Sequence, residues 1–191
     1  QHLLPLGNQI KEQGLAAKKE GRPVQAKHCS VLYHQIWSLL PSFCDLPTDT
    51  AENFRHLAKT VGSLLASDQG LQIIICNALQ MLIQNFQKVV TKSRGDDAEE
   101  GEGYRRKKAS FKDIVSEVQG DRSVPVEEAY ASLKAISGFS KNFLPILFNI
   151  FNTQCHSNPH KNTVRNKAVL LNTIEAFVLI SSPDVRCSFL I

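Results

Sequence analysis

Cysteine and histidine side chains come together at two places in the chain, and both are candidate metal sites. Cys155 and His156 are adjacent, with His160 four residues further on. His28 and Cys29 are adjacent within a segment of helical pattern that also contains His34. Structural zinc takes four ligands, and neither group supplies four. A polar loop that carries histidines is the more ordinary interpretation of the first group, and core packing of Cys29 is the more ordinary interpretation of the second. We therefore predict no metal and no cofactor.

Motifs that would organise catalysis are missing from the sequence. It contains no G-x-x-x-x-G-K-[ST] or G-x-G-x-x-G loop for phosphate, no G-x-S-x-G nucleophile turn and no H-E-x-x-H zinc helix. We predict no catalytic residues and no enzymatic activity. An enzyme remains a hypothesis that rests only on the loop around Cys155 and His156.

Lysine and arginine cluster at three places that could contact the phosphates of RNA. The candidates in the C-terminal part are Arg105, Arg106, Lys107, Lys108, Lys161, Arg165 and Lys167, and those near the start are Lys11, Lys18, Lys19, Arg22 and Lys27. The run at residues 105–108 also fits a nuclear-import signal, and Ser110 follows it at the spacing of a phosphorylation site. Solvated helix faces carry such charges without any function. RNA contact at these residues is therefore a hypothesis, and it predicts salt-dependent binding.

Composition indicates an ordinary globular chain of 191 residues, with 42% hydrophobic and 21% charged side chains and a net charge of +4. No run of 18 uninterrupted apolar residues occurs, so we predict no membrane-spanning helix and no membrane partner. We expect no small-molecule substrate either. The five cysteines form no C-x-x-C pair, which predicts free thiols in a reducing compartment.

Apolar residues recur at the helical period through most of the chain, and alternation of the strand type is scarce. The clearest stripe contains Phe54, Ala58, Val61 and Leu65, with Thr48 or Asp49 as a candidate cap. In the first helix we expect Leu3, Leu6, Ile10 and Ala17 to face the core. The predicted helices span residues 2–19, 24–40, 49–65, 71–90, 125–136, 139–151 and 162–180, and a last one starts near residue 182.

A charged stretch divides the chain. Residues 96–102 are acidic, three glycines lie in and beside this block at positions 95, 101 and 103, and the basic run follows directly. Apolar residues are too sparse there to offset the entropy of ordering, so we predict disorder over residues 92–109. The expected organisation is residues 1–91 as the first helical hairpins, 92–123 as a charged insertion and 124–191 as continuing hairpins that are truncated at the end.

Helix pairs recur about every 40 residues, which is the repeat length of HEAT and armadillo proteins. We therefore predict an all-α fold, an α-solenoid of HEAT/armadillo-like helical hairpins, with a compact helical bundle as the structural alternative. The apolar end Ser188–Ile191 predicts that the chain is a piece of a longer polypeptide, because each solenoid repeat buries its apolar face on the next.

Two segments are distinctive beyond their periodicity. Residues 35–65 read QIWSLLPSFCDLPTDTAENFRHLAKTVGSLL, and residues 140–151 read SKNFLPILFNIF. In this order they resemble blocks of the ribosomal RNA processing protein 12 family. The resemblance is carried by Trp37, Pro41, Phe43, Cys44, Pro47, Asp49 and Phe54. Of these, we expect Trp37, Pro41, Phe43 and Phe54 to be structural.

The resemblance implies a non-enzymatic HEAT-repeat scaffold of the nucleolus and nucleus. It implies roles in ribosome biogenesis: pre-rRNA processing, and assembly or nuclear export of pre-ribosomal subunits. The implied partners are pre-ribosomal particles, ribosomal RNA and assembly factors. The alternative is an importin-like interaction or transport adaptor that does not contact RNA directly. In either case we expect Trp37, Pro41 and Phe43 to set the angle between two helices.

Overall fold

The computed structural model describes residues 3–96, 124–155 and 161–188, and those residues form helices without any strand. The first half contains α1 (Leu3–Lys19), α2 (Pro23–Ser38), the 3₁₀ helix η1 (Leu40–Cys44), α3 (Thr50–Ser67) and α4 (Gln72–Asp96). The second half contains α6 (Val126–Ser137), α7 (Ser140–Cys155), α8 (Lys161–Ile180) and α9 (Pro183–Ser188). The all-α prediction is confirmed.

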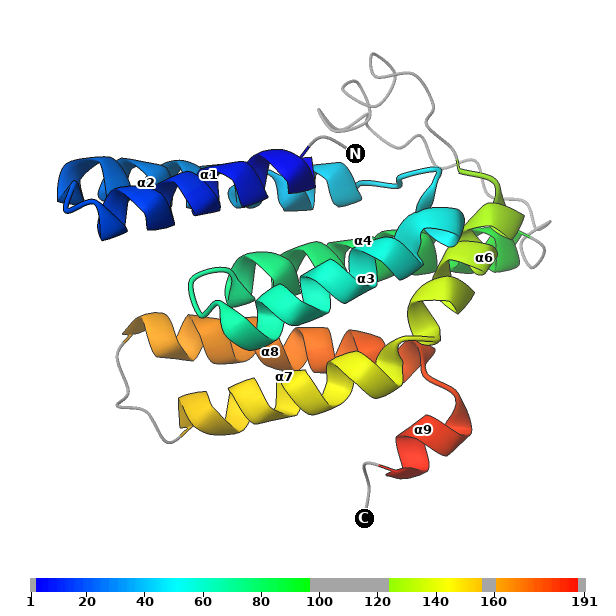
Figure 1. The fold of residues 1–191 in the computed structure, drawn as a ribbon. Coiled ribbons are helices and arrows are strands. Elements are labelled where there is room, and N and C mark those ends of the chain that lie inside the picture. The colour runs from blue at the N-terminus through cyan, green and yellow to red at the C-terminus, as the bar shows by residue number, and fades with distance from the viewer. Residues whose placement is uncertain (1–2, 97–123, 156–160, 189–191) are drawn as a thin grey trace, which may run out of the picture.

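Antiparallel hairpins are stacked one on the next in the described part of the chain (Figure 1). The pairs are α1–α2, α3–α4 and α7–α8, and α6 packs across α3 and α4. Between neighbouring hairpins, α3 lies beside α7 and α4 lies beside α8. In these two hairpins the first helices contact each other and the second helices contact each other, which is the arrangement of a solenoid.

Proline and glycine separate the elements as the sequence predicts, with two local differences. Gly21 takes a positive φ of 68° in the turn before Pro23, where the absence of a side chain removes the steric cost. The second helix ends at Ser38, and η1 follows around Pro41. Asp49 precedes α3 as predicted, but its side chain makes no capping hydrogen bond and instead accepts one from the Asn53 side chain at 3.4 Å.

The contact face of α1 agrees with the predicted one at Ile10 and Ala17 but not at Leu6. Leu6 is 45% exposed, whereas Gly7 and Ala17 are buried. A Cβ added at Gly7 would lie 3.1 Å from Nε1 of Trp37, and one added at Gly14 would lie 3.0 Å from Cβ of Cys29. The two helices therefore approach closely through small residues, and the larger leucine is left outside that contact.

The fourth helix is longer than expected. It continues to Asp96, so residues 92–96 are helical and the structure corrects the predicted start of the disordered stretch. The Thr91 hydroxyl donates to the main-chain oxygen of Gln87, which is compatible with a continuing helix. Buried Val90 attaches the same turn to the core. The rest of the predicted insertion, residues 97–123, lies outside the described residues.

One core runs through the stacked hairpins. Phe143 of α7 contacts Phe54 of α3, with ring centroids 6.5 Å apart, and stacks on Phe177 of α8 at 5.2 Å. The Thr173 hydroxyl of α8 donates to the main-chain oxygen of Cys76 in α4 at 3.3 Å. Aromatic packing and one interhelical hydrogen bond thus join α7 and α8 to the preceding hairpin.

By length and composition, residues Gln72–Ser93 of α4 are apolar enough to cross a membrane. In this structure the segment lies against η1, α6 and α8. Ile75, Cys76, Ile83 and Phe86 are fully buried there. A central helix of a folded core meets the same criteria as a membrane span.

Candidate functional site

The two groups considered as candidate metal ligands do not assemble into a site among the described residues. No cluster of three histidine, cysteine, aspartate or glutamate side chains occurs in that part of the chain. Cys155 is exposed at the end of α7, and His156 and His160 lie outside the described residues. Cys29 is buried against α1, as core packing requires, while the neighbouring His28 is exposed.

All five cysteines are free thiols, as predicted, but they differ in exposure. Burial raises the pKa of Cys44 from 9.0 to about 11, and burial raises that of Cys76 from 9.0 to about 12. Both groups therefore stay protonated at neutral pH. Cys155 and Cys187 are exposed instead.

Of the candidate RNA-contact residues in the C-terminal part, those that the structure describes are spread around α8. Lys161 begins α8, Arg165 is exposed and Lys167 is half-buried. Positions 165 and 167 diverge by about 200° around the helix axis, so their side chains do not face the same way. The run Arg105, Arg106, Lys107 and Lys108 lies outside the described residues, as does Ser110.

Basic residues near the start of the chain gather at the turn between α1 and α2. Lys18 and Lys19 end α1, Arg22 precedes α2 and Lys27 lies in the first turns of α2. Arg22 is paired with Glu20. Lys11 lies apart from this turn, with its ammonium 5.6 Å from the centre of the Tyr33 ring.

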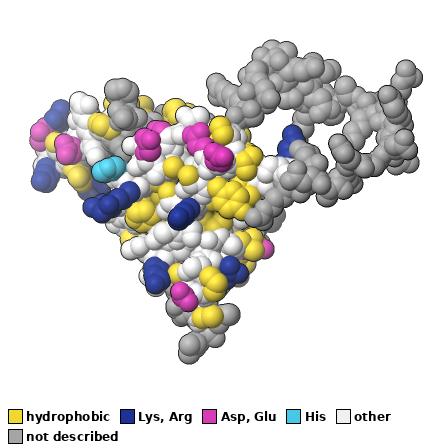
Figure 2. All heavy atoms as spheres, turned by 90° about the vertical axis from the view of Figure 1, so that its right-hand side faces the viewer, with side chains coloured by type: hydrophobic (Ala, Val, Ile, Leu, Met, Phe, Trp, Pro, Cys, Tyr) yellow, Lys and Arg dark blue, Asp and Glu magenta, His cyan; other side chains and the backbone are white. Residues whose placement is uncertain are grey.

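The opposite end of the molecule, which carries α6, is shown in Figure 2. There, charges of both signs are scattered among apolar side chains.

The residues expected to be structural have different environments. Trp37 is fully buried and packs edge-on to Tyr33, with ring centroids 6.3 Å apart. Phe54 is buried against Phe139, at 5.7 Å between ring centroids. Pro41 lies in η1. Phe43 is 63% exposed, because the short turn buries Leu40 and Cys44 instead, so its side chain has no place in the core.

A buried polar pair accompanies Trp37. The Tyr33 hydroxyl and Nε1 of Trp37 are both buried and make no well-formed hydrogen bond to the protein within the described residues. Burial, with a contribution from the nearby Asp68 carboxylate, raises the pKa of Tyr33 from 10.0 to about 12.

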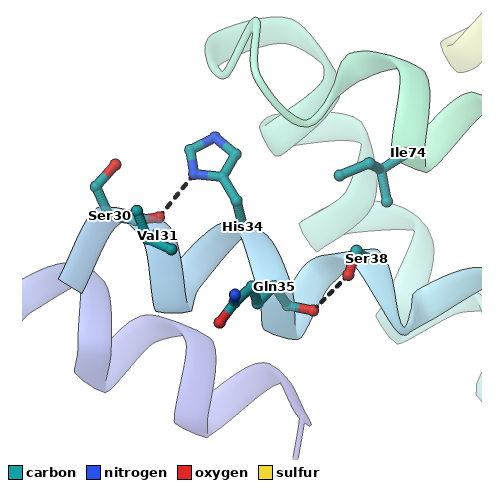
Figure 3. Close-up of a pocket in the computed structure, with 6 residues that line it drawn as sticks. All are labelled: Ser30, Val31, His34, Gln35, Ser38 and Ile74. Atoms are coloured by element: carbon teal, nitrogen blue, oxygen red, sulfur yellow. Dashed lines mark hydrogen bonds between the residues drawn. The ribbon is translucent and has the colours of Figure 1, made fainter. Parts of the chain in front are cut away.

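A shallow depression lies between α2 and α4. It has a volume of about 380 Å³ and is lined by Ser30, Val31, His34, Gln35, Ser38 and Ile74 (Figure 3). Nδ1 of His34 is 2.8 Å from the main-chain oxygen of Ser30, and the Ser38 hydroxyl donates to that of Gln35. Two of its polar side chains are thus hydrogen-bonded to main-chain oxygens of α2 itself. The six lining residues form no arrangement for catalysis.

A larger groove, of about 750 Å³, runs between η1 and α4. Its α4 side consists of Asn77, Gln80, Met81, Gln84, Asn85 and Lys88, and its other side consists of Pro41, Ser42 and Asp45. The Asn85 side chain donates to Asp45 at 3.1 Å, which joins the two sides. We call this feature the amide groove.

Sequence reasoning missed the amide groove because it treated the polar positions of α4 as ordinary solvent-facing residues. The available signal was their spacing. Positions 77, 80, 81, 84, 85 and 88 follow i, i+3, i+4, i+7, i+8 and i+11, which places them on one helix face. What the pattern could not show was that η1 forms a second side.

The stacked helical hairpins agree with the result of comparison with known families. A model of the family described as "Ribosomal RNA-processing protein 12, HEAT repeats" matches residues 1–154. The chain belongs to this family. The helices within residues 1–154 therefore belong to its HEAT repeats, and the predicted solenoid class is confirmed.

Curated relatives of the family match along most of the chain. An RRP12-like protein of Gallus gallus is 29% identical over 191 residues, and its Homo sapiens counterpart is 29% identical over 189 residues, each covering 99% of this chain. Ribosomal RNA-processing protein 12 of Saccharomyces cerevisiae is 28% identical over 162 residues, or 84% of the chain. The chain spans only about 11% of the length of these relatives.

Proposed function

We propose that this chain is one section of a non-enzymatic HEAT-repeat scaffold that acts in ribosome biogenesis. The observation that carries the proposal is the match of a ribosomal RNA-processing HEAT family to residues 1–154, together with the stacked hairpins of the described residues. Stacked repeats present long surfaces on which several partners bind at once. The scaffold supports pre-rRNA processing, and assembly or nuclear export of pre-ribosomal subunits.

The proposed partners are pre-ribosomal particles, ribosomal RNA and assembly factors, and the proposed location is the nucleolus and nucleus. Two of the relatives carry ribosomal RNA processing in their names. The proposal assigns no catalytic residue, cofactor, membrane or small-molecule substrate to this chain. Its physical contribution is to hold surfaces at fixed spacing.

Depletion of the intact protein from cells tests the proposal. We expect unprocessed ribosomal RNA precursors to accumulate, measured by hybridisation, and the tagged protein to sediment with pre-ribosomal particles in a sucrose gradient. Unchanged precursor levels, with a protein that sediments free of precursor RNA, would contradict the proposal. A depleted strain that carries the unmodified gene on a plasmid is the control.

An adaptor that does not contact RNA is the second candidate, and it is favoured by the dispersed cations of α8 and by the nearly neutral amide groove. Ultraviolet crosslinking of the intact protein to RNA in cells separates the two. Direct contact predicts crosslinked nucleotides near Arg165 or residues 105–108, reduced in an Arg165→Ala variant and unchanged in Lys141→Ala on exposed α7 surface. No crosslink in residues 1–191 identifies the adaptor.

A further inference from the structure

The amide groove is rich in carboxamide side chains, and most of them make no hydrogen bond to the rest of the protein that the structure describes. Four of its α4 side chains end in a carboxamide: Asn77, Gln80, Gln84 and Asn85. Asn77 and Gln84 are exposed, and Gln80 and Asn85 are half-buried. Among the described residues, the carboxamides of Asn77, Gln80 and Gln84 make no hydrogen bond to the protein, so they are free to bind a partner.

A carboxamide is the side-chain group that best matches a polypeptide main chain. Its oxygen accepts and its nitrogen donates, so it can pair with both the N–H and the C=O of a peptide unit. From position 77 to position 88 the helix advances about 16 Å at 1.5 Å per residue. An extended chain covers that distance with about five residues. Successive turns of α4 thus present amides along a length that fits a short extended segment.

The charges of the groove argue against RNA as its occupant. Lys88 is its one cation and Asp45 its one anion among the lining residues, so their charges offset each other. Proteins that follow a nucleic-acid backbone line the path with several lysines or arginines, because each phosphate carries a charge. An uncharged main chain is the better electrostatic match to these neutral, dipolar side chains.

The groove also does not fit a helical partner. A helix has paired its own main-chain groups and binds through apolar side chains that enter an apolar groove. Among the residues that line the groove, only Met81 and Pro41 have apolar side chains. Met81 is 39% exposed at the centre of the stripe, where a flexible side chain can adapt to different neighbours. An extended segment has unpaired main-chain N–H and C=O groups, which can form hydrogen bonds with the carboxamides of the groove. A helix would leave these carboxamides without partners.

We propose that the amide groove between η1 and α4 binds an extended segment of a partner protein, about five residues long, by hydrogen bonds from its carboxamides to the partner's main chain. The proposal deepens the scaffold function and rests on it for the existence of a protein partner. Met81 contacts a partner side chain loosely, so the site accepts varied sequences. The Asp45–Asn85 hydrogen bond holds the two sides of the groove together.

A photocrosslinking amino acid placed at Gln84 in the intact protein, expressed in cells, identifies the occupant. The matched control is the same amino acid at Asn142, which is exposed on α7. We expect crosslinks from position 84, absent from position 142, that mass spectrometry maps to one short linear stretch of a protein. Crosslinks to RNA, crosslinks to a folded helix, or none above the control would each overturn the proposal.

A synthetic peptide of the mapped stretch then tests the mode of binding to the purified intact protein. Methylation of single peptide nitrogens removes a main-chain donor without changing any side chain, and we expect about tenfold weaker binding at alternate positions. The variant Asn77→Ala/Gln84→Ala should lose at least as much, with unchanged helical content, and Asn142→Ala should lose nothing. Affinity that is insensitive to N-methylation would overturn main-chain recognition. Precursor processing in the depletion experiment reports separately on the scaffold function. A failure of the groove proposal can therefore be distinguished from a failure of the proposed scaffold function.

Discussion

Substitution of Gly7 by alanine should lower stability, although the same change inside a helix normally raises it. Alanine is favoured over glycine in a helix by about 1 kcal/mol. At Gly7 the new methyl group would lie 3.1 Å from Nε1 of Trp37, closer than the about 3.5–4.0 Å of an ordinary contact. Trp37 is fully buried, so the ring has no free space into which it can move. Overpacking costs about 1–3 kcal/mol, and we expect a net loss of about 1 kcal/mol.

A second substitution isolates the cause. Trp37→Phe removes the ring nitrogen that the methyl group would meet, and it also removes a buried N–H without a hydrogen-bond partner. In this background Gly7→Ala should stabilise by up to about 1 kcal/mol, as helix propensity dictates. The coupling in the double-mutant cycle is then about 2 kcal/mol, well above the about 0.5 kcal/mol expected of independent sites. Trp37→Ala should cost about 3–5 kcal/mol because it leaves a cavity.

Urea unfolding of the 191-residue chain, followed by far-ultraviolet circular dichroism, measures these free energies without relying on tryptophan fluorescence. Gly62→Ala in α3 is the matched control, since its methyl group would lie 3.8 Å from Cε1 of Phe143, an ordinary contact distance. We expect that control to stabilise by about 1 kcal/mol. If Gly7→Ala stabilises the unmodified chain as the control does, the close contact between α1 and Trp37 is wrong.

Three further predictions concern the core and the buried ionisable groups. Phe143→Ala should lower the free energy of unfolding by about 3–5 kcal/mol, because its ring is buried, whereas Phe43→Ala should lower it by about 0.5 kcal/mol or less, because its ring is exposed. Equal losses of stability in urea unfolding would count against the described packing. A thiol reagent should label exposed Cys187 rapidly in the folded chain and buried Cys76 only after unfolding, as peptide mass spectrometry would report. Because the folded state raises the pKa of Tyr33 from 10.0 to about 12, its contribution to stability should be complete below pH 10 and lost as the pH rises through 12. Tyr33→Phe should flatten that part of the pH–stability curve, and an unaltered curve would refute the assignment.

Periodicity predicted most of the helices because the helical repeat of apolar side chains is a local property. The stripe of α3 illustrates this: Phe54, Ala58, Val61 and Leu65 are all buried, as expected from spacing alone. Proline and glycine marked the turns, since proline restricts the backbone and glycine frees it, and both effects act locally. The last helix turns of α4 were missed because charge composition was taken to end the helix before residue 92.

The amino-acid sequence by itself determined the all-α class, the stacked hairpins, the free thiols and, through two distinctive segments, the family. The tertiary structure decided which side of α1 meets α2, that Phe43 is exposed while Leu40 is buried, and that η1 makes a groove with the amide face of α4. The reason is physical: a helical period specifies which residues share a face, but the neighbour of that face depends on contacts between residues far apart in the chain. A polar stripe therefore becomes a groove only when another element is placed beside it.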